Sequence, residues 1–212
     1  MLLLGHRGAR ATSAVPENTI PSFDLALHHG CDGFEFDVRR TSDGHAVIGH
    51  DPKAKGRTIA RTTRIQLATL PTLEDVLQRY REKAFLDIEL KVAGMEEQVL
   101  KALRDCRPEK GFVISSFLLS VLTKIRDLDQ NVPLGLIADR RTPLARWRKL
   151  PVQCVIVEKR LATRKLTDEV HAEGRKLFVW TVNDRRAMWR LAEYGVDGVI
   201  SDDTQLLVRT LP

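Results

Sequence analysis

The stretch Cys154-Val155-Ile156-Val157 is a run of four apolar residues with no polar residue to mark a solvent face, and Phe178-Val179-Trp180 repeats the pattern further along the chain. A half-exposed strand alternates apolar and polar residues, whereas a strand of a parallel sheet is covered on both faces and is apolar throughout. These two stretches therefore predict strands buried in a parallel sheet.

Eight β-rich segments alternate with helix-like segments along the 212 residues. The predicted strands cover Leu2–Gly5, Gly33–Val38, Ala84–Leu90, Phe112–Ser115, Leu134–Ile137, Cys154–Val157, Lys176–Val182 and Gly198–Ser201. Eight strands, each followed by a helix, are typical of a closed (β/α)8 TIM barrel. An open doubly wound sheet is the structural alternative, but it normally has a glycine-rich phosphate loop, and Gly5-His6-Arg7-Gly8 lacks the third glycine. We therefore expect residues 1–212 to form a single, small α/β domain with the TIM-barrel fold.

Capping signals indicate where helices begin. We expect Asn18 to cap a helix that runs to Gly30, and Asp184 to begin another. Thr72 stands three residues before Asp75, which predicts a capping box.

An insertion is expected after the second strand. Asp43-Gly44 is typical of a hairpin turn, so His45–Gly49 is predicted to form a short extra strand. Residues Lys53–Leu70 show no periodicity and are predicted to form a loop or a short insertion over one end of the barrel.

The chain is basic, with 34 Lys and Arg residues against 28 Asp and Glu residues. A positive net charge favours anionic partners. The basic residues are scattered and are not interleaved with aromatic residues, which argues against nucleic acid as the partner. Residues Arg140–Lys149 form the densest basic cluster, with Trp147 inside it; we interpret the cluster as a solvated helix face, with weak contact to a membrane surface or a partner protein as the alternative.

The sequence shows no apolar run near the roughly 20 residues that a membrane-spanning helix needs. Leu2-Leu3-Leu4 is too short for the core of a signal peptide. Three cysteines without metal-type spacing indicate buried thiols in a reducing compartment. We therefore expect a cytoplasmic protein.

Three acidic residues are expected to converge where two strands end. Glu35 and Asp37 are two apart and so share one face of a strand, and Glu89 occupies a matching place on another strand. Three carboxylates at one point repel each other unless a cation lies among them. Because all the ligands are oxygens, Mg²⁺ or Ca²⁺ is expected, with Mn²⁺ as a further choice, rather than Zn²⁺.

Basic and aromatic side chains are expected beside these acids. His6 and His50 flank the strands, and imidazole is the side chain best suited to proton transfer near neutral pH. Arg7 can bind phosphate oxygens in a bidentate manner, and Lys91 can add a point charge, so that together they offset the excess negative charge for an anionic substrate. Trp180 ends an apolar strand and is expected either to wall the pocket or to pack in the core.

A series of motifs extends from the first strand to the last. In order, the motifs are Gly5-His6-Arg7-Gly8, Pro16-Glu17-Asn18-Thr19, Phe34-Glu35-Phe36-Asp37-Val38, Asp43-Gly44, His50-Asp51, Pro71 to Leu77, Asp87-Ile88-Glu89-Leu90-Lys91, Ser115-Ser116-Phe117, Trp180-Thr181-Val182-Asn183 and Gly195 to Asp202. In this order they resemble the glycerophosphodiester phosphodiesterase family over the whole chain.

The resemblance implies a metal-dependent TIM-barrel phosphodiesterase of lipid and glycerol metabolism. Such an enzyme hydrolyses glycerophosphodiesters to an alcohol and glycerol 3-phosphate, with a cyclic phosphate formed by the substrate's own hydroxyl. By the same resemblance His6 and His50 match the catalytic acid–base pair, and Glu35, Asp37 and Glu89 match the metal ligands.

Other functions stay open at this point. The segment after His50 is shorter and more basic than is common in the family, so head-group choice is not fixed by sequence. A lysophospholipase D acting on lysophospholipids is the alternative of the same class. A non-catalytic phospholipid-binding domain and a nucleic-acid-binding module are the alternatives from other classes.

Overall fold

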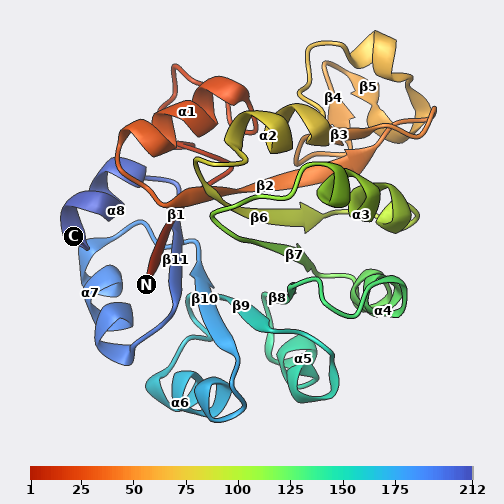
Figure 1. Ribbon diagram of the computed structural model, residues 1–212. Helices are drawn as coiled ribbons and strands as arrows, with labels where there is room; N and C mark the ends of the chain where they lie inside the picture. Colours follow the sequence, from red (N-terminus) through yellow and green to blue (C-terminus); the bar gives the residue numbers. More distant parts are fainter. Residues whose placement is uncertain (212) are drawn as a thin grey trace.

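Eight parallel strands close into a barrel in the computed structural model, which describes residues 1–211 (Figure 1). The strands are β1 (Leu2–His6), β2 (Gly33–Arg40), β6 (Phe85–Leu90), β7 (Phe112–Ser116), β8 (Leu134–Ala138), β9 (Cys154–Glu158), β10 (Lys176–Trp180) and β11 (Gly198–Ser201). Their order around the barrel is their order in sequence, and β1 pairs with both β2 and β11. The closed TIM barrel and its eight strands are therefore confirmed, with small differences at the strand ends.

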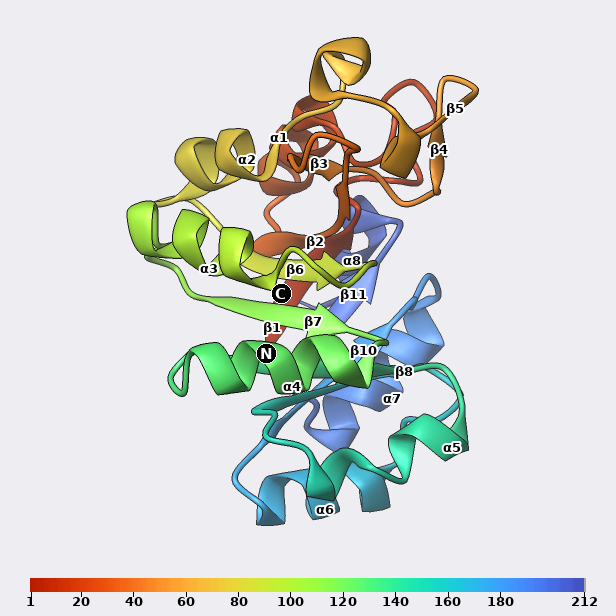
Figure 2. The ribbon, with the colours of Figure 1, turned by 90° about the vertical axis from the view of Figure 1, so that its right-hand side faces the viewer.

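Helices surround the barrel as an outer ring, as Figures 1 and 2 show. The helices are α1 (Ile20–His28), α2 (Leu73–Tyr80), α3 (Glu96–Asp105), α4 (Leu119–Leu128), α5 (Arg141–Leu144), α6 (Arg164–Ala172), α7 (Arg185–Tyr194) and α8 (Thr204–Thr210). Within residues 1–211, no helix has the length and apolar content required to cross a membrane.

The capping predictions are confirmed for two helices and wrong for one. Thr72 and Asp75 form the expected capping box of α2, and the Asp184 side chain accepts a hydrogen bond at the start of α7. Asn18 does not cap α1: Thr19 does, by accepting from the backbone N–H of Ser22. Asn18 adopts a positive φ of 57° and its side chain is used elsewhere, at the mouth of the barrel.

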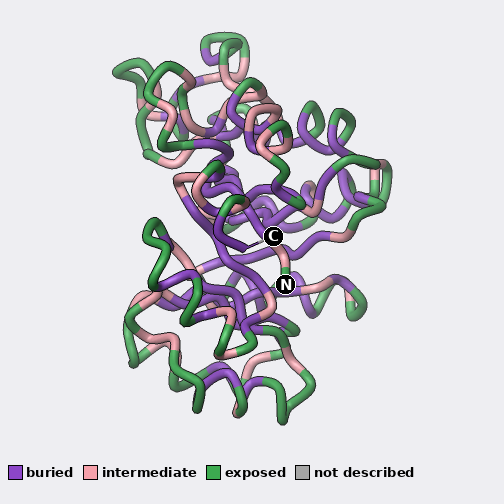
Figure 3. Tube along the Cα trace, turned by 90° about the vertical axis from the view of Figure 1, so that its left-hand side faces the viewer, coloured by how far each residue is buried: buried purple, intermediate pink, exposed green. Residues whose placement is uncertain are grey.

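The barrel interior is packed with apolar side chains rather than open. Leu4, Ile137, Ile156, Phe178 and Ile200 are buried there in one cluster. A second, larger cluster fills the space between the strands and the helices. Figure 3 shows the same division, with buried strands inside and exposed turns outside.

Strand β2 divides its side chains between these two cores. Phe34 and Phe36 belong to the outer cluster, where Phe34 stacks on Phe23 of α1 with 4.2 Å between ring centroids. Because neighbouring residues of a strand point to opposite faces, this packing directs Glu35 and Asp37 into the barrel.

The insertion after β2 lies at the end of the barrel where the parallel strands terminate (Figure 2). Strand β3 (Ala46–Ile48) pairs antiparallel with β2, which confirms the predicted extra strand. Residues 53–70 are not a plain loop, because they contain the small hairpin of β4 (Lys53–Ala54) and β5 (Arg57–Thr58). Two 3-10 turns follow, at Ile59–Arg61 and Arg64–Leu67.

The basic cluster at 140–149 forms a helix of only four residues, α5, and a 3-10 turn over Trp147–Lys149. Trp147 is only 2% exposed. The guanidinium groups of Arg148 and Arg175 lie 4.5 and 5.1 Å from its ring. The prediction of a solvated helix face therefore fails for Trp147, which anchors the segment to the core.

We predict that Gly33→Ala destabilises the fold more than Gly174→Ala. A Cβ at Gly33 would lie 1.9 Å from the carbonyl oxygen of Phe85, in the pairing between β2 and β6. Since a backbone atom has to move, we expect a loss of about 2–3 kcal/mol. Gly174 has a positive φ but open space, so Ala there should cost only about 1 kcal/mol. Urea unfolding measures both; equal losses would contradict the steric explanation.

Candidate active site

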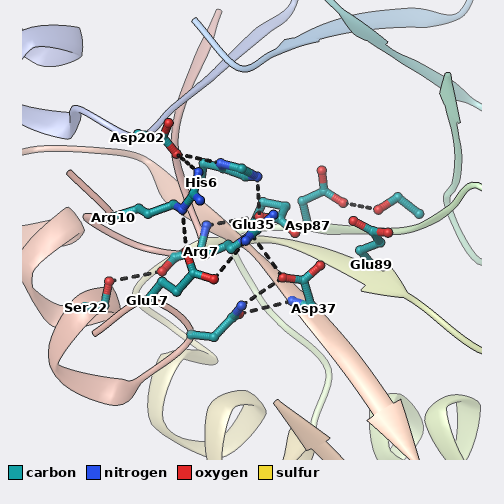
Figure 4. Close-up of polar contacts among 12 residues, drawn as sticks. His6, Arg7, Arg10, Glu17, Ser22, Glu35, Asp37, Asp87, Glu89 and Asp202 are labelled. Atoms are coloured by element: carbon teal, nitrogen blue, oxygen red, sulfur yellow. Dashed lines mark hydrogen bonds and ion pairs between the residues drawn. The ribbon is translucent and has the colours of Figure 1, made fainter. Parts of the chain in front are cut away.

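The eight site residues predicted from the sequence lie on strands or within two residues after them. They are His6 at the end of β1, Arg7 after it, Glu35 and Asp37 on β2, His50 after β3, Glu89 at the end of β6, Lys91 after it, and Trp180 at the end of β10. Figure 4 shows how the acidic and basic groups of β1, β2 and β6 point toward one another at this mouth.

Glu35, Asp37 and Glu89 form the centre of the cluster. One carboxylate oxygen from each lies within 4.8 Å of the others, and the three side chains are buried. Glu35 Oε1, Asp37 Oδ1 and Glu89 Oε1 are buried without a hydrogen-bond donor among the described residues. Three unsatisfied carboxylate oxygens that face one another fit a hard divalent cation, which takes oxygen ligands.

The pKa values of these acids diverge because they share a buried site. Burial, with repulsion from Asp37 and Glu89, raises the pKa of Glu35 well above its usual value. Burial and the charge of Asp37 raise the pKa of Glu89 to about 7. Burial acts in the same direction on Asp37, but the positive charges of Lys91 and Arg7 outweigh it and lower the pKa of Asp37.

Two cations lie beside the carboxylates. Lys91 Nζ is 2.7 Å from Glu89 Oε1 and 3.3 Å from Asp37 Oδ1, at ion-pair distance but without hydrogen-bond geometry to either oxygen. Arg7 Nε is 3.3 Å from Asp37 Oδ2, and an Arg7 terminal nitrogen donates to Glu17 at 2.8 Å. These contacts hold both cations at the mouth.

The first loop fixes the orientation of the acids. Asn18 donates to Asp37 Oδ2 at 2.8 Å and accepts from the backbone N–H of Asp37 at 3.2 Å. The backbone N–H of Arg7 donates to Glu35 Oε2 at 3.0 Å. With these oxygens occupied, the opposite oxygens, Glu35 Oε1 and Asp37 Oδ1, are the ones without a hydrogen-bond donor; Asp37 Oδ1 has only its ion pair with Lys91.

His6 is oriented by Asp202, which follows β11. His6 Nδ1 lies 2.7 Å from Asp202 Oδ1, and Asp202 is also held by Asn183 at 2.7 Å and by Arg10 at 3.2 Å. Burial opposes ionisation of Asp202, but its bonds to His6, Asn183 and Arg10 lower its pKa overall. Asp202 is therefore a carboxylate, and Nδ1 of His6 carries the proton that it accepts. The other ring nitrogen, Nε2, is 3.9 Å from Glu35 and is free to accept a proton.

His50 lies on a different side of the mouth from His6. Its side chain is 34% exposed, and its Nδ1 is 2.9 Å from the carboxylate of Asp51. Both histidines line the same cavity of about 120 Å³. The cavity thus has one buried and one solvent-accessible imidazole.

Apolar and aromatic side chains form the rest of this cavity, the candidate catalytic cavity. Phe117 and Trp180 pack edge to face with centroids 5.8 Å apart. Asp87 reaches the floor, 1% exposed, and accepts a 2.5 Å hydrogen bond from Ser115. Burial raises the pKa of Asp87 to about 7. Trp180 therefore walls the pocket, as one of the two sequence interpretations expects.

Three contributors were not predicted as part of the site. Asp87 precedes Glu89 by two residues on β6, so strand alternation could have placed it on the same inward face. Asp202 and His6 are 196 residues apart and meet only because β1 pairs with β11. Asn18 was interpreted as a helix cap, and its sequence position gives no sign of its contact with Asp37.

The sequence matches one family model over most of its length. Residues 6–84 and 60–206 match the Glycerophosphoryl diester phosphodiesterase family. A relative from Caldanaerobacter subterraneus subsp. tengcongensis, named glycerophosphodiester phosphodiesterase, is 30% identical over 98% of this chain and 96% of its own.

Solved structures share the barrel. A glycerophosphodiester phosphodiesterase from Thermotoga maritima superposes with a TM-score of 0.85 at 25% identity, and covers 99% of this chain and 97% of its own. A phosphodiesterase from Oleispira antarctica, solved in complex with the product sn-glycerol-3-phosphate, superposes with a TM-score of 0.87 at 24% identity over 100% of this chain and 96% of its own.

We predict that Glu89→Gln stabilises the protein at pH 8 in the presence of chelator. Glu89 ionises near pH 4.5 when unfolded and near pH 7 when folded, so the wild type loses stability as the pH rises through this window. Gln removes that loss. Since one pKa unit corresponds to about 1.4 kcal/mol, we expect a gain of at least about 1 kcal/mol at pH 8 and none at pH 4.

Denaturant unfolding at both pH values measures the difference. Glu82→Gln, at an exposed position of the same residue type, serves as the control and should change stability little at either pH. A Glu89→Gln protein that is less stable than the wild type at pH 8 would show that Lys91 outweighs the repulsion.

Proposed function

Because this chain belongs to the glycerophosphoryl diester phosphodiesterase family, and is thereby a phosphoric diester hydrolase, we propose that it hydrolyses glycerophosphodiesters to an alcohol and glycerol 3-phosphate with a divalent cation at the barrel mouth. The observation that carries this proposal is the cluster of three buried, unsatisfied carboxylate oxygens in one cavity with two imidazoles. Mg²⁺, Ca²⁺ and Mn²⁺ all suit such a ligand set.

The related proteins support this choice of substrate. The Caldanaerobacter relative is named for the activity, and the Oleispira phosphodiesterase was solved with sn-glycerol-3-phosphate as its product. We extend both to this chain as a small-molecule substrate of the same class. No observation here favours a lysophospholipase D or a non-catalytic lipid-binding domain over this function.

Glu35, Asp37 and Glu89 would hold the cation through the oxygens that lack a donor. A bound divalent cation supplies Lewis-acid polarisation of a phosphoryl oxygen and lowers the pKa of a hydroxyl near it. It also resolves the repulsion that raises the pKa values of Glu35 and Glu89.

Arg7 and Lys91 make the mouth acceptable to an anionic diester. Three carboxylates and a dication leave an excess of negative charge, which would repel the phosphate. The two side-chain cations offset it, and Arg7 presents a planar guanidinium suited to phosphate oxygens.

The two histidines are the groups that can move protons. Hydrolysis requires a base that takes a proton from the attacking hydroxyl and an acid that gives one to the departing alkoxide. His6 has Nε2 free for one of these transfers because Nδ1–H is committed to Asp202. His50, at the exposed side of the cavity, serves the other.

Phe117 and Trp180 shape the pocket for the small alcohol part of the substrate. Their rings cover the apolar side of the cavity and limit the water that can enter beside the phosphate. The indole Nε1–H of Trp180 is buried without an acceptor among the described residues, so it can donate to a substrate oxygen.

The first test is metal-dependent release of glycerol 3-phosphate from a panel of glycerophosphodiesters. Activity should require Mg²⁺, Ca²⁺ or Mn²⁺ and disappear with chelator. His6→Ala and His50→Ala should each lower kcat by about 10²–10⁴, the usual contribution of a general acid or base.

The control is His28→Ala, since His28 is exposed at the end of α1, away from the mouth. It should retain wild-type kcat, and circular dichroism should show all variants folded. Wild-type rates in either His6→Ala or His50→Ala would remove that residue from the proposed mechanism.

The Asp202–His6 contact predicts a change in pH profile. Burial lowers the pKa of His6, and Asp202 opposes that shift through its hydrogen bond and its charge. Asp202→Asn removes the charge and weakens the hold on Nδ1–H, so kcat should fall by about 10²–10⁴. The limb of the pH–rate curve that belongs to His6 should move toward acid.

Asp203→Asn is the matched control: it makes the same charge change one residue away, and Asn can keep the helix cap at Leu206. It should leave the profile in place. A uniform loss of rate in Asp202→Asn, with no shift of either limb, would indicate a purely structural role for Asp202.

A further inference from the structure

A second cavity, of about 250 Å³, adjoins the catalytic cavity on the side of β2 and the insertion. We call it the mouth cavity; among its lining residues are Arg39, Arg40, Pro52, Thr58, Ala60 and Val92. The lining residues of the two cavities are close in sequence at two places. His50 and Lys91 line the catalytic cavity, and Pro52 and Val92 line the mouth cavity.

Arg39 links the two cavities. It follows Glu35 and Asp37 at two-residue spacing on β2 and therefore shares their face of the strand. Its Nε donates to the backbone carbonyl of His50 at 2.7 Å. One edge of the guanidinium is thus fixed beside the catalytic histidine.

The other end of that guanidinium is free. Within residues 1–211, the two terminal nitrogens of Arg39 have no hydrogen-bond or salt-bridge partner, and Arg40 has none at all. The hydroxyls of Ser42 and Thr58, which also line the mouth cavity, donate to no group in the same range. The cavity therefore offers guanidinium and hydroxyl donors that have no bonded partner, with the carboxylates of Asp37, Asp51 and Glu89 acting on Arg39 only through longer-range electrostatic attraction.

The lining also excludes a cationic head group. It includes no carboxylate and no aromatic ring, so a quaternary ammonium would find neither an opposite charge nor a cation–π partner. An anionic oxygen group would find the guanidinium of Arg39, whose two terminal nitrogens are available for bidentate contact; the side chain of Arg40, its neighbour on β2, points to the opposite face of the strand.

We propose that the mouth cavity binds a phosphate monoester carried by the alcohol part of the substrate, so that the enzyme prefers glycerophosphodiesters with a phosphorylated head group. This inference rests on the proposed function and names its substrate class. The short basic insertion then serves as the wall that supplies the head-group site.

The test compares two soluble substrates that differ only in the monoester: glycerophosphoinositol and glycerophosphoinositol 4-phosphate. At low salt the wild type should show kcat/KM about tenfold higher for the phosphorylated diester, which is the scale of one charge-assisted bidentate contact. Turnover of unphosphorylated glycerophosphoinositol reports the proposed function separately.

Two variants probe the cavity. Arg39→Gln should lower the rate on both substrates, since it frees the His50 carbonyl, but it should also bring their ratio close to one. Ala60→Glu places a negative charge in the cavity at an exposed position without touching Arg39, and should bring the ratio to one or below. Arg57→Gln is the matched control, because it removes an exposed charge from β5 outside the lining and should keep the ratio.

Inhibition by free phosphate distinguishes binding at a head-group site from binding at the site of reaction. Inorganic phosphate should inhibit hydrolysis of the phosphorylated diester more than that of its parent, since it competes at both sites. Equal inhibition, or a wild-type ratio near one with glycerophosphoinositol turned over, would overturn the inference and leave the proposed function standing. Failure to hydrolyse any diester with metal present would overturn both.

Discussion

The chemistry of this barrel depends on forcing acidic side chains of two neighbouring strands into a space from which water is largely excluded. Phe34 and Phe36 pack outward against helices, and because strand side chains alternate, Glu35 and Asp37 face into the barrel. Parallel pairing sets Asp37 opposite Glu89 on β6, so the acids of the two strands meet at one level of the barrel. The hydrophobic packing between strands and helices thus forces like-charged carboxylates close together inside the barrel, where they repel one another.

This repulsion between buried carboxylates explains how the surrounding residues are arranged. Burying an uncompensated carboxylate costs several kcal/mol, so such groups are protonated, paired with cations or bound to a metal. The negative charges of Asp37 and Glu35 are compensated to different degrees. Asp37 is paired with Lys91 and Arg7 and accepts a hydrogen bond from Asn18. Glu35 accepts only one backbone hydrogen bond, at Oε2, and is repelled by the neighbouring carboxylates. The three acids thus form a group that could hold a metal ion.

The sequence predicted the parts of this arrangement that depend on local periodicity. Continuous apolar runs located the strands, and two-residue spacing placed Glu35 with Asp37, because both follow from the geometry of one strand. Contacts between distant segments could not be read in the same way. The bond between His6 and Asp202 depends on the register of Gly5 with Ser201, which exists only after the barrel closes. Trp147 was assigned to solvent because its neighbours in sequence are basic, while Arg175, which helps to enclose it, comes from 28 residues away.

Barrel closure sets the geometry of His6. Its ring stands on β1, the first strand to be made, while the carboxylate that selects its tautomer follows β11, the last. An imidazole with Nε2 free therefore arises only when the two ends of the sheet have paired. His50 depends on a different constraint, because the bond from Arg39 to its backbone carbonyl ties it to β2 and to the insertion. The fold thus holds His6 through the closed sheet and His50 through the insertion. Changes in the insertion can therefore alter the position of His50 while the geometry of His6 stays fixed.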